Sequence, residues 1–325
     1  MDPLSQLVSL LDPRGRMELR CLFGPSFAAP HDSAGPWRAP FHIVLRGECE
    51  LWLPQTRETL ALHPGTLAIL PRGAAHTLRS ASGPRGGRRA AGIRSLSGDV
   101  LALKTNLGTP QPVAGDADIE ILCGEFEFRG RRRSALLEAL PEGLAIEFGE
   151  RPEFGWLEGL VRMMAHEIEQ QQAGAAAIVA ELSGALFTLA VRAHLDIRPE
   201  QRGVLGLMRN GRLAPALKAM LDEPGQPWTV ATLAERCHLS RASFARLFAQ
   251  QAGGAPLELL TTLRMELAAR LLAQGTQDTA TIGEAVGYRS EAAFNRAFAR
   301  HAGATPGRFR RATAASEDDA TTTAR

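Results

Sequence analysis

The sequence is poor in the features that mark several classes of protein. Only four of its 325 residues are cysteines, and Cys21, Cys49, Cys123 and Cys237 lie far apart with no Cys-x-x-Cys pair. This excludes a secreted disulfide scaffold and a zinc knuckle. No run of eighteen apolar residues occurs, and the N-terminus, MDPLSQLVSLLDP, lacks the pattern of a signal peptide. We therefore expect no membrane span and a cytoplasmic location.

A net charge of one sign is nearly absent from the whole chain, which carries a formal +2. The excess is local, because residues 223–311 hold eleven arginines, no lysine and seven acidic residues, whereas residues 1–222 are balanced at 25 basic and 25 acidic groups. A basic segment built only on arginine suits contact with phosphates and with guanine. A length of 325 residues is enough for two domains, and the apolar share of 45% with a charged share of 22% indicates a globular chain.

The N-terminal part has the pattern of short strands. Met17, Leu19, Cys21 and Phe23 alternate with polar residues, and the same period of two recurs around residues 49–53. Residues 79–118 are rich in Gly, Pro and Ser, which predicts a flexible insertion between two strands. Three arginines cluster in this segment, and they are interpreted as a solvated face: Arg85, Arg88 and Arg89.

Helical periods replace the strand pattern from residue 133. The segments 155–170 and 175–195 place apolar residues three and four positions apart, and the second is apolar on more than one face. Such a helix needs a partner. Packing against the first domain and a homodimer interface are both open explanations.

Residues 229–251 predict a helix-turn-helix. Leu233, Ala234 and Cys237 share one helical face, Ser240 is suited to cap the next helix, and Phe244, Leu247 and Phe248 form its buried stripe. A second unit follows about fifty residues later, with Ile282, Ala285 and Val286 buried, Gly287 in the turn, Ser290 as cap, and Phe294, Ala297 and Phe298 facing inward. The segments SRASFARLFAQQAGGAP and SEAAFNRAFARHAGATP match at Ser, Phe, Arg, Phe and the closing Ala-Gly-x-x-Pro. A duplicated motif is more specific than a single one.

Residues 225–311 resemble the DNA-binding domain of the AraC family, including the linker-helix pattern LRMELAARLL and the closing stretch YRSEAAFNRAFARHAGATPGRFRR. The resemblance implies binding to double-stranded DNA, with a recognition helix of each unit in the major groove. It also implies a set of DNA-facing residues, in which arginine and asparagine pair with base edges and serine meets phosphates. These residues are Arg241, Ser243, Arg246, Ser290, Glu291, Asn295 and Arg296.

Gly65–His76 fits the second cupin motif, G-x5-P-x-G-x2-H, at each fixed position. The first motif is reduced, since only His42 stands where cupin enzymes carry His-x-His, and no Glu follows at ligand spacing. We therefore expect no metal and no other cofactor. His42 and His76 are weak metal candidates, to be completed by His31, His63 or a cysteine. The alternative, histidines packed inside a small barrel, is favoured.

Residues 1–220, apart from the insertion, resemble the cupin-type sensor half of an AraC subgroup that includes regulators responding to reactive chlorine oxidants. In that subgroup the cysteines matching Cys21 and Cys123 are implicated in sensing. Their places on the apolar side of strands argue instead for inert thiols with raised pKa, unless Arg20 or the loop arginines lower that pKa. Both interpretations stay open, and Cys49 and Cys237 are expected to be structural.

The predicted fold is α+β: a cupin-like barrel, a helical region, and an all-α domain with two helix-turn-helix units joined by a linker helix. We expect a cupin-like sensor in 1–130, a helical linker or dimerisation region in 131–222, the DNA-binding domain in 223–311 and a disordered tail in 312–325. The predicted function is a sequence-specific transcription regulator, not an enzyme, that senses an oxidant or a small molecule. RNA polymerase is a further partner if it activates. The alternatives are a cupin metalloenzyme with a DNA-binding appendage and a ligand-gated regulator without redox chemistry.

Overall fold

The computed structural model describes residues 1–35, 37–81, 92–97, 101–128, 134–149, 151–198 and 200–323. They form two compact units that are interleaved along the chain. The barrel unit comprises Pro13–Glu127 and Pro141–Ile197. The helical unit comprises Met1–Asp12, Phe128–Leu140 and Arg198–Arg325.

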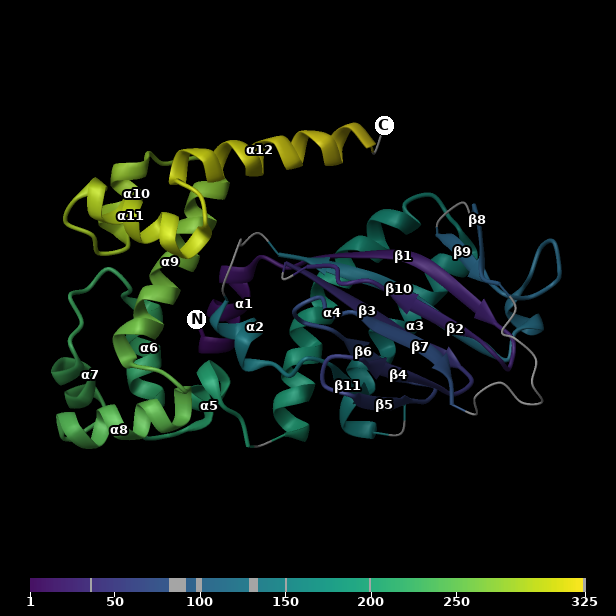
Figure 1. Cartoon of the computed structure of the whole chain (residues 1–325), viewed down its shortest axis with the longest axis horizontal. Helices are drawn as coiled ribbons and strands as arrows, with labels where there is room; N and C mark the ends of the chain where they lie inside the picture. The colour runs from purple at the N-terminus through teal and green to yellow at the C-terminus, as the bar shows by residue number, and fades with distance from the viewer. Residues whose placement is uncertain are drawn as a thin grey trace. The chain divides into compact units, whose positions relative to one another are not determined.

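Two sheets make up the strand part of the barrel unit (Figure 1). The seven-stranded sheet has the order β11-β6-β3-β10-β1-β9-β8 and the four-stranded sheet the order β2-β7-β4-β5. The strands are β1 (Arg14–Phe23), β2 (Ala28–His31), β3 (Arg38–Arg46), β4 (Cys49–Leu53), β5 (Glu58–Leu62), β6 (Thr66–Ile69), β7 (His76–Ser80), β8 (Arg94–Leu96), β9 (Ala102–Thr105), β10 (Ile119–Glu127) and β11 (Leu144–Glu147). The alternation predicted for residues 17–23 is present only in part: Met17, Cys21 and Phe23 are buried, but Leu19 is half-buried and Leu22 is buried as well.

The predicted insertion is not irregular throughout. Within 79–118, β8 and β9 pair with each other, and β9 also runs parallel to β1 from Leu19 to Leu22. The prediction of a flexible insertion is therefore wrong for these strands. The sequence did not predict β8 and β9, because strands of three and four residues have too few positions for a period of two to be detected among the Gly and Pro residues of this segment. Arg85, Arg88 and Arg89 lie outside the described residues.

Helices α3 (Gly155–Gln170) and α4 (Ala175–Ile197) belong to the barrel unit, where α4 packs along β1 and against α3. The approach is close, since a Cβ added at Gly15 would lie 2.4 Å from Cβ of Ser183. Packing of this apolar segment against the strands is confirmed; a homodimer interface stays a prediction. Among the described helices, α4 alone is long and apolar enough to cross a membrane, a test that a core helix also passes.

The helical unit gathers segments from three parts of the chain. Its helices are α1 (Pro3–Leu11), α2 (Ala135–Ala139), α5 (Gly203–Arg209), α6 (Ala214–Asp222), α7 (Val230–Arg236), α8 (Arg241–Ala252), α9 (Pro256–Gln274), α10 (Thr279–Ala285), α11 (Glu291–Ala302) and α12 (Pro306–Thr323). α1 contacts α6 and α9, and α2 contacts α5 and α9. The compact units thus divide the chain differently from the expected boundaries at 130 and 222.

The tail after Arg311, expected to be disordered, continues α12 as far as Thr323. Phe309 anchors the start of this helix, because it is fully buried with its ring 5.4 Å from that of Phe298. Alanines with high helix propensity follow. An anchored first turn removes the cost of helix nucleation, which composition alone does not show.

Candidate nucleic-acid interface and buried thiol site

The two helix-turn-helix units repeat the same capped helix. Ser240 and Ser290 are the N-caps of α8 and α11, and each hydroxyl accepts a hydrogen bond from the backbone N–H three residues later. Both helices have twelve residues and end at a glycine in the left-handed conformation, Gly253 or Gly303. The predicted caps are confirmed at both sites.

Paired phenylalanines hold each recognition helix from its inner side. Phe244 and Phe248 of α8 are fully buried with ring centroids 5.5 Å apart, and Phe294 and Phe298 of α11 are fully buried at 5.7 Å. A Cβ at Gly283 would lie 3.2 Å from the ring of Phe294, so the second unit uses glycine where helices cross. Ala285, expected to be buried, is exposed, because Gly283 takes the inward position in α10.

The turn inside each unit places one residue at positive φ. This residue is Gly287 in the second unit, with φ 85°, and His238 in the first, with φ 52°. In both turns the following N–H returns to the preceding helix: Leu239 donates to Ala234 at 3.0 Å and Tyr288 to Gly283 at 2.9 Å. The predicted turn at Gly287 is present, and the histidine at the matching place gives no glycine signal in the sequence.

Arg246 and Arg296 stand in the same register, six residues after their N-caps, and both are exposed. Arg241 and Glu291 are also exposed, each as the first residue of its helix. The side chains predicted to face DNA on the two helices therefore have matching positions. α9, which joins the units, has 19 residues and a length of about 28 Å, close to one turn of B-DNA.

The remaining predicted residues are less free. Ser290 is engaged as the cap of α11, and the Ser243 hydroxyl accepts a hydrogen bond from Ser240 at 3.0 Å. Asn295 is half-buried, and its Oδ1 has no hydrogen-bond partner among the described residues. Arg300, which was not among the predicted residues, is a further exposed arginine one turn beyond Arg296. Its spacing of four residues was the available signal.

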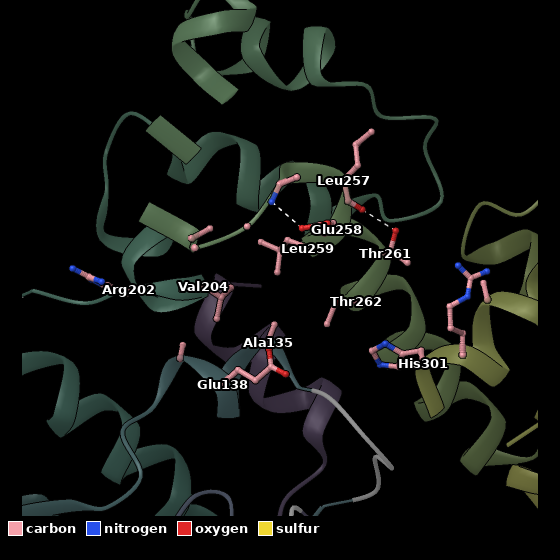
Figure 2. Close-up of a pocket in the computed structure, with 18 of the residues that line it drawn as sticks. Ala135, Glu138, Arg202, Val204, Leu257, Glu258, Leu259, Thr261, Thr262 and His301 are labelled. Atoms are coloured by element: carbon pink, nitrogen blue, oxygen red, sulfur yellow. Dashed lines mark hydrogen bonds between the residues drawn. The ribbon is translucent and has the colours of Figure 1, made fainter. Parts of the chain in front are cut away.

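A groove of about 1070 Å³ lies within the helical unit beside α11. Figure 2 shows Ala135 and Glu138 of α2 on one side and Leu257, Glu258 and Thr261 of α9 on the other. Arg296 and Arg300 line the same groove. A shift of α2 would therefore change the surroundings of a predicted DNA-reading arginine.

Two cysteines and two histidines meet inside the barrel unit. Sγ of Cys21 lies 3.6 Å from Sγ of Cys123, and Sγ of Cys123 lies 3.2 Å from Nδ1 of His42. Nε2 of His42 lies 2.8 Å from Nε2 of His76. All four residues are at most 4% exposed. The strands that supply them are β1, β10, β3 and β7.

His31 of β2 covers this cluster. Its ring is parallel to that of His76 with centroids 4.6 Å apart, because His31 and His76 are directly paired across β2 and β7. Lys104, which is paired with Cys21 across β1 and β9, is a cation that acts electrostatically on the cluster. Of the cations expected to lower the thiol pKa if they approach, Arg20 forms an ion pair with Glu120 at 2.6 Å, and the loop arginines lie outside the described residues.

Burial keeps the cluster uncharged. Desolvation lowers the pKa of His42 well below its usual 6.5, lowers that of His76, and lowers that of His31 to about 4. The hydrogen bond with Cys21, together with desolvation, raises the pKa of Cys123 well above 9, against a smaller opposing effect of Lys104. Desolvation also raises the pKa of Cys49 to about 12 and raises that of Cys237.

The geometry does not suit a shared metal ion. His42 directs Nδ1 at Cys123 and Nε2 at His76, so its two neighbours lie on opposite sides of the ring. Across the part of the chain that the structure describes, no group of three or more His, Cys, Asp or Glu side chains is placed to hold a metal. His63, named as a further candidate, lies 3.6 Å from Glu48 instead.

Comparison with known proteins gives two family matches. Residues 2–196 match the family described as Cupin, and residues 233–312 match that described as Helix-turn-helix domain. The chain is 30% identical to the RCS-specific HTH-type transcriptional activator RclR of Escherichia coli (strain K12) over 95% of this chain and 97% of the relative. It is also 30% identical to a putative AraC-like transcription regulator of Streptomyces lividans, over 96% of this chain and 98% of that protein.

A solved structure, the DNA-binding domain of AdpA in complex with a target DNA, is 33% identical to 31% of this chain and is covered over 95% of its own length. Its TM-score is 0.30.

Proposed function

Because the chain belongs to the AraC-like transcription regulators, with a cupin domain ahead of the helix-turn-helix domain, we propose that this DNA-binding regulator senses a two-electron oxidant through Cys21 and Cys123. The observation that carries the proposal is the 3.6 Å separation of the two buried sulfurs. Oxidation to a disulfide would close this gap to about 2 Å. The name of the E. coli relative, RCS-specific transcriptional activator, supports an oxidant as the signal.

A disulfide would act on β1 and β10, two neighbouring strands of the seven-stranded sheet. Cys21 pairs with Ile121 and Cys123 with Leu19, so the cysteines are diagonal neighbours across β1 and β10. Diagonal positions are about 7–8 Å apart between Cα atoms, beyond the common disulfide range. The bond therefore requires the strands to shift, and oxidation favours a different strand arrangement.

The chain itself links these strands to the helical unit. α1 ends at Leu11 and β1 begins at Arg14, while β10 ends at Glu127 and α2 begins at Ala135. α1 and α2 both contact α9, the helix that joins the two reading units. A shift of β1 and β10 would act on the DNA-reading helices through these two short connections, and a signal works by favouring one such arrangement.

Transcription from a target promoter, measured with and without oxidant, tests the sensing proposal. Cys21→Ser and Cys123→Ser should each abolish the response, whereas Cys49→Ser should keep it. Cys49 is the matched control, because it is a buried barrel cysteine 2% exposed that belongs to no sulfur pair described here. An unchanged response in both pair variants would refute oxidant sensing, and a DNA affinity indifferent to oxidants and reductants would favour a small-molecule effector.

The barrel is proposed to be a sensor and not a catalytic centre, since His42 and His76 already bind each other where cupin enzymes hold a metal. Metal analysis of the purified protein tests this: stoichiometric iron, manganese or zinc would support a metalloenzyme instead. DNA binding at the seven predicted positions and a cytoplasmic location are part of the same proposal.

A homodimer is a further proposal, and exposed apolar side chains on the helices of the barrel unit support it. Trp156 and Met163 of α3 and Ile178 of α4 are 38%, 52% and 41% exposed. Met163→Glu should shift the mass measured by light scattering from dimer to monomer, whereas Arg162→Glu, which removes no apolar side chain, should not. A monomeric wild-type protein would contradict the proposal.

A further inference from the structure

Hydrogen bonds in the barrel fix the protonation pattern of the cluster from one end. Nδ1 of His76 lies 2.9 Å from the carbonyl oxygen of Ala74. A carbonyl only accepts, so Nδ1 of His76 carries the proton. Burial keeps this ring neutral, so its Nε2 is bare and accepts a hydrogen bond from Nε2–H of His42.

The tautomer of His42 fixes which of the two sulfurs donates and which accepts. His42 is also neutral, so with its proton on Nε2 its Nδ1 is bare and faces Sγ of Cys123 at 3.2 Å. The Cys123 thiol therefore donates to His42. Sγ of Cys123 is then left as the acceptor for the Cys21 thiol at 3.6 Å. The chain runs in one direction, from Cys21 through Cys123 and His42 to His76.

We propose that His42 is the general base that activates Cys123, which makes Cys123 the thiol that meets the oxidant first and Cys21 the thiol that resolves it. His76 and Ala74 are positioning groups, because they hold the one tautomer of His42 that can accept from sulfur. His31 holds the ring of His76 by stacking on it. The inference rests on the proposed oxidant sensing.

Hypochlorous acid represents the two-electron oxidants that Cys123 would meet. Sγ of Cys123 attacks chlorine, the S–Cl bond forms and the O–Cl bond breaks, while the thiol proton passes through Nδ1 of His42 to the leaving hydroxide, giving water. Sγ of Cys21 then attacks Sγ of Cys123, the S–S bond forms, and chloride leaves with the Cys21 proton. The two sulfurs together lose two electrons, and chlorine gains them.

A base is needed here, because the pKa of Cys123 is raised well above 9 and its thiol stays protonated near neutral pH. Other charged or titratable groups facing His42 are His31 on β2, His76 on β7, Lys104 on β9 and the two thiols on β1 and β10. Lys104 is a cation beside the sulfurs that favours negative charge on Cys123 as its proton leaves.

The first test compares single-cysteine proteins. Full-length Cys21→Ser and Cys123→Ser are exposed to less than one equivalent of hypochlorous acid. With no second thiol to resolve it, the sulfenyl chloride is hydrolysed by water to a sulfenic acid and chloride, a cyclic 1,3-diketone traps the sulfenic acid, and labelling is read by mass spectrometry. Cys123 in the Cys21→Ser protein should be labelled at least tenfold faster than Cys21 in the Cys123→Ser protein. Equal labelling, or faster labelling of Cys21, would overturn the assignment.

The second test uses stopped-flow rates of disulfide formation between pH 6 and 8.5 in the wild type and His42→Gln. After correction for the ionisation of hypochlorous acid, which turns into less reactive hypochlorite within this range, the wild-type rate should be nearly independent of pH, because His42 stays neutral throughout. His42→Gln should react about 100-fold more slowly at pH 7 and gain about tenfold per pH unit, as a free thiolate does. His76→Gln, which can still accept from His42, should lie between them.

The outcomes separate the inference from the proposed function. A disulfide that forms equally fast in His42→Gln removes the base but leaves oxidant sensing intact. A wild-type protein that forms no Cys21–Cys123 disulfide removes both. If His42→Gln does not fold, as judged by circular dichroism, the single-cysteine comparison still decides which thiol is activated.

Discussion

His238 and Gly287 occupy the corresponding turns of the two helix-turn-helix units, and both have a positive φ although only one of them is a glycine. A non-glycine residue in the left-handed region costs about 1–2 kcal/mol. Glycine avoids this cost, but it loses more conformational entropy on folding than other residues, which offsets part of the gain. His238→Gly should therefore stabilise the helical unit by up to about 1 kcal/mol in thermal unfolding followed by circular dichroism.

Gly287→Ala provides the opposite case. A Cβ there would lie 2.6 Å from the carbonyl oxygen of Gly225, at φ 85°. This variant should lose more than about 1 kcal/mol of unfolding free energy. If both variants shift the melting temperature in the same direction, the two turns are not equivalent.

Arg246 and Arg296 share a register, and an arginine that pairs with guanine contributes about 1–3 kcal/mol to specific binding. Arg246→Ala and Arg296→Ala should each weaken operator binding by that amount in a fluorescence-anisotropy titration at fixed salt. Arg212→Ala is the control, because it removes the same charge from an exposed position before the first reading unit. A loss limited to nonspecific DNA would remove the arginine from the set that reads bases.

At the scale of single elements, α9 contains a buried glutamate, a residue type that is rarely buried because desolvation of its charge is costly. Glu266 is 7% exposed, and its Oε1 accepts a hydrogen bond from the backbone N–H of Ala135 at 2.6 Å. That bond holds the start of α2 against α9. Desolvation raises the pKa of Glu266 to about 8.

Because the pKa of Glu266 is raised, the unfolding free energy of the helical unit depends on pH in a definite direction. The unfolded chain loses the Glu266 proton near 4.5, whereas the folded helical unit keeps it until about 8. The contribution is therefore complete below pH 4.5 and is lost as the pH rises to 8. Glu266→Gln keeps an acceptor without the charge, so it should be more stable than wild type at pH 8 and similar at pH 5, by urea unfolding. Parallel pH profiles would contradict this.

Elements with a strong local signal were predictable, and those that depend on distant partners were not. The caps Ser240 and Ser290 and the buried phenylalanines follow from spacing within one helix. β8 and β9 did not, because strands of three and four residues are defined by their pairing with β1. α12 likewise depends on Phe309 reaching the ring of Phe298.

At the scale of the whole molecule, the interleaving of the units is the feature that sequence patterns missed. Residues 1–12 and 128–140 flank the strands that carry Cys21 and Cys123, but they fold with the C-terminal helices. Periodicity reports which face of an element is buried and not which unit buries it. For the thiol site, sequence named Cys21, Cys123, His42 and His76 as separate candidates, and only the structure joins them into one hydrogen-bonded chain.

The two units should respond to pH in opposite directions. In the barrel unit burial lowers the pKa of His31 to about 4 and that of His42 well below 6.5. The unfolded chain binds these protons near pH 6.5, so the barrel is stable above that pH and loses up to about 1.4 kcal/mol per histidine for each unit of acidification. Glu266 gives the helical unit the reverse dependence.

Tryptophan fluorescence can separate the two responses, because Trp228 is the single tryptophan of the helical unit and the other three belong to the barrel unit. In Trp228→Phe, fluorescence reports the barrel, and its urea midpoint should fall between pH 6.5 and 4.5. His42→Gln should make that fall shallower, because one buried imidazole is gone. A barrel midpoint that holds steady on acidification would mean that the histidines are solvated, and the one-directional chain from Cys21 to His76 would lose its basis.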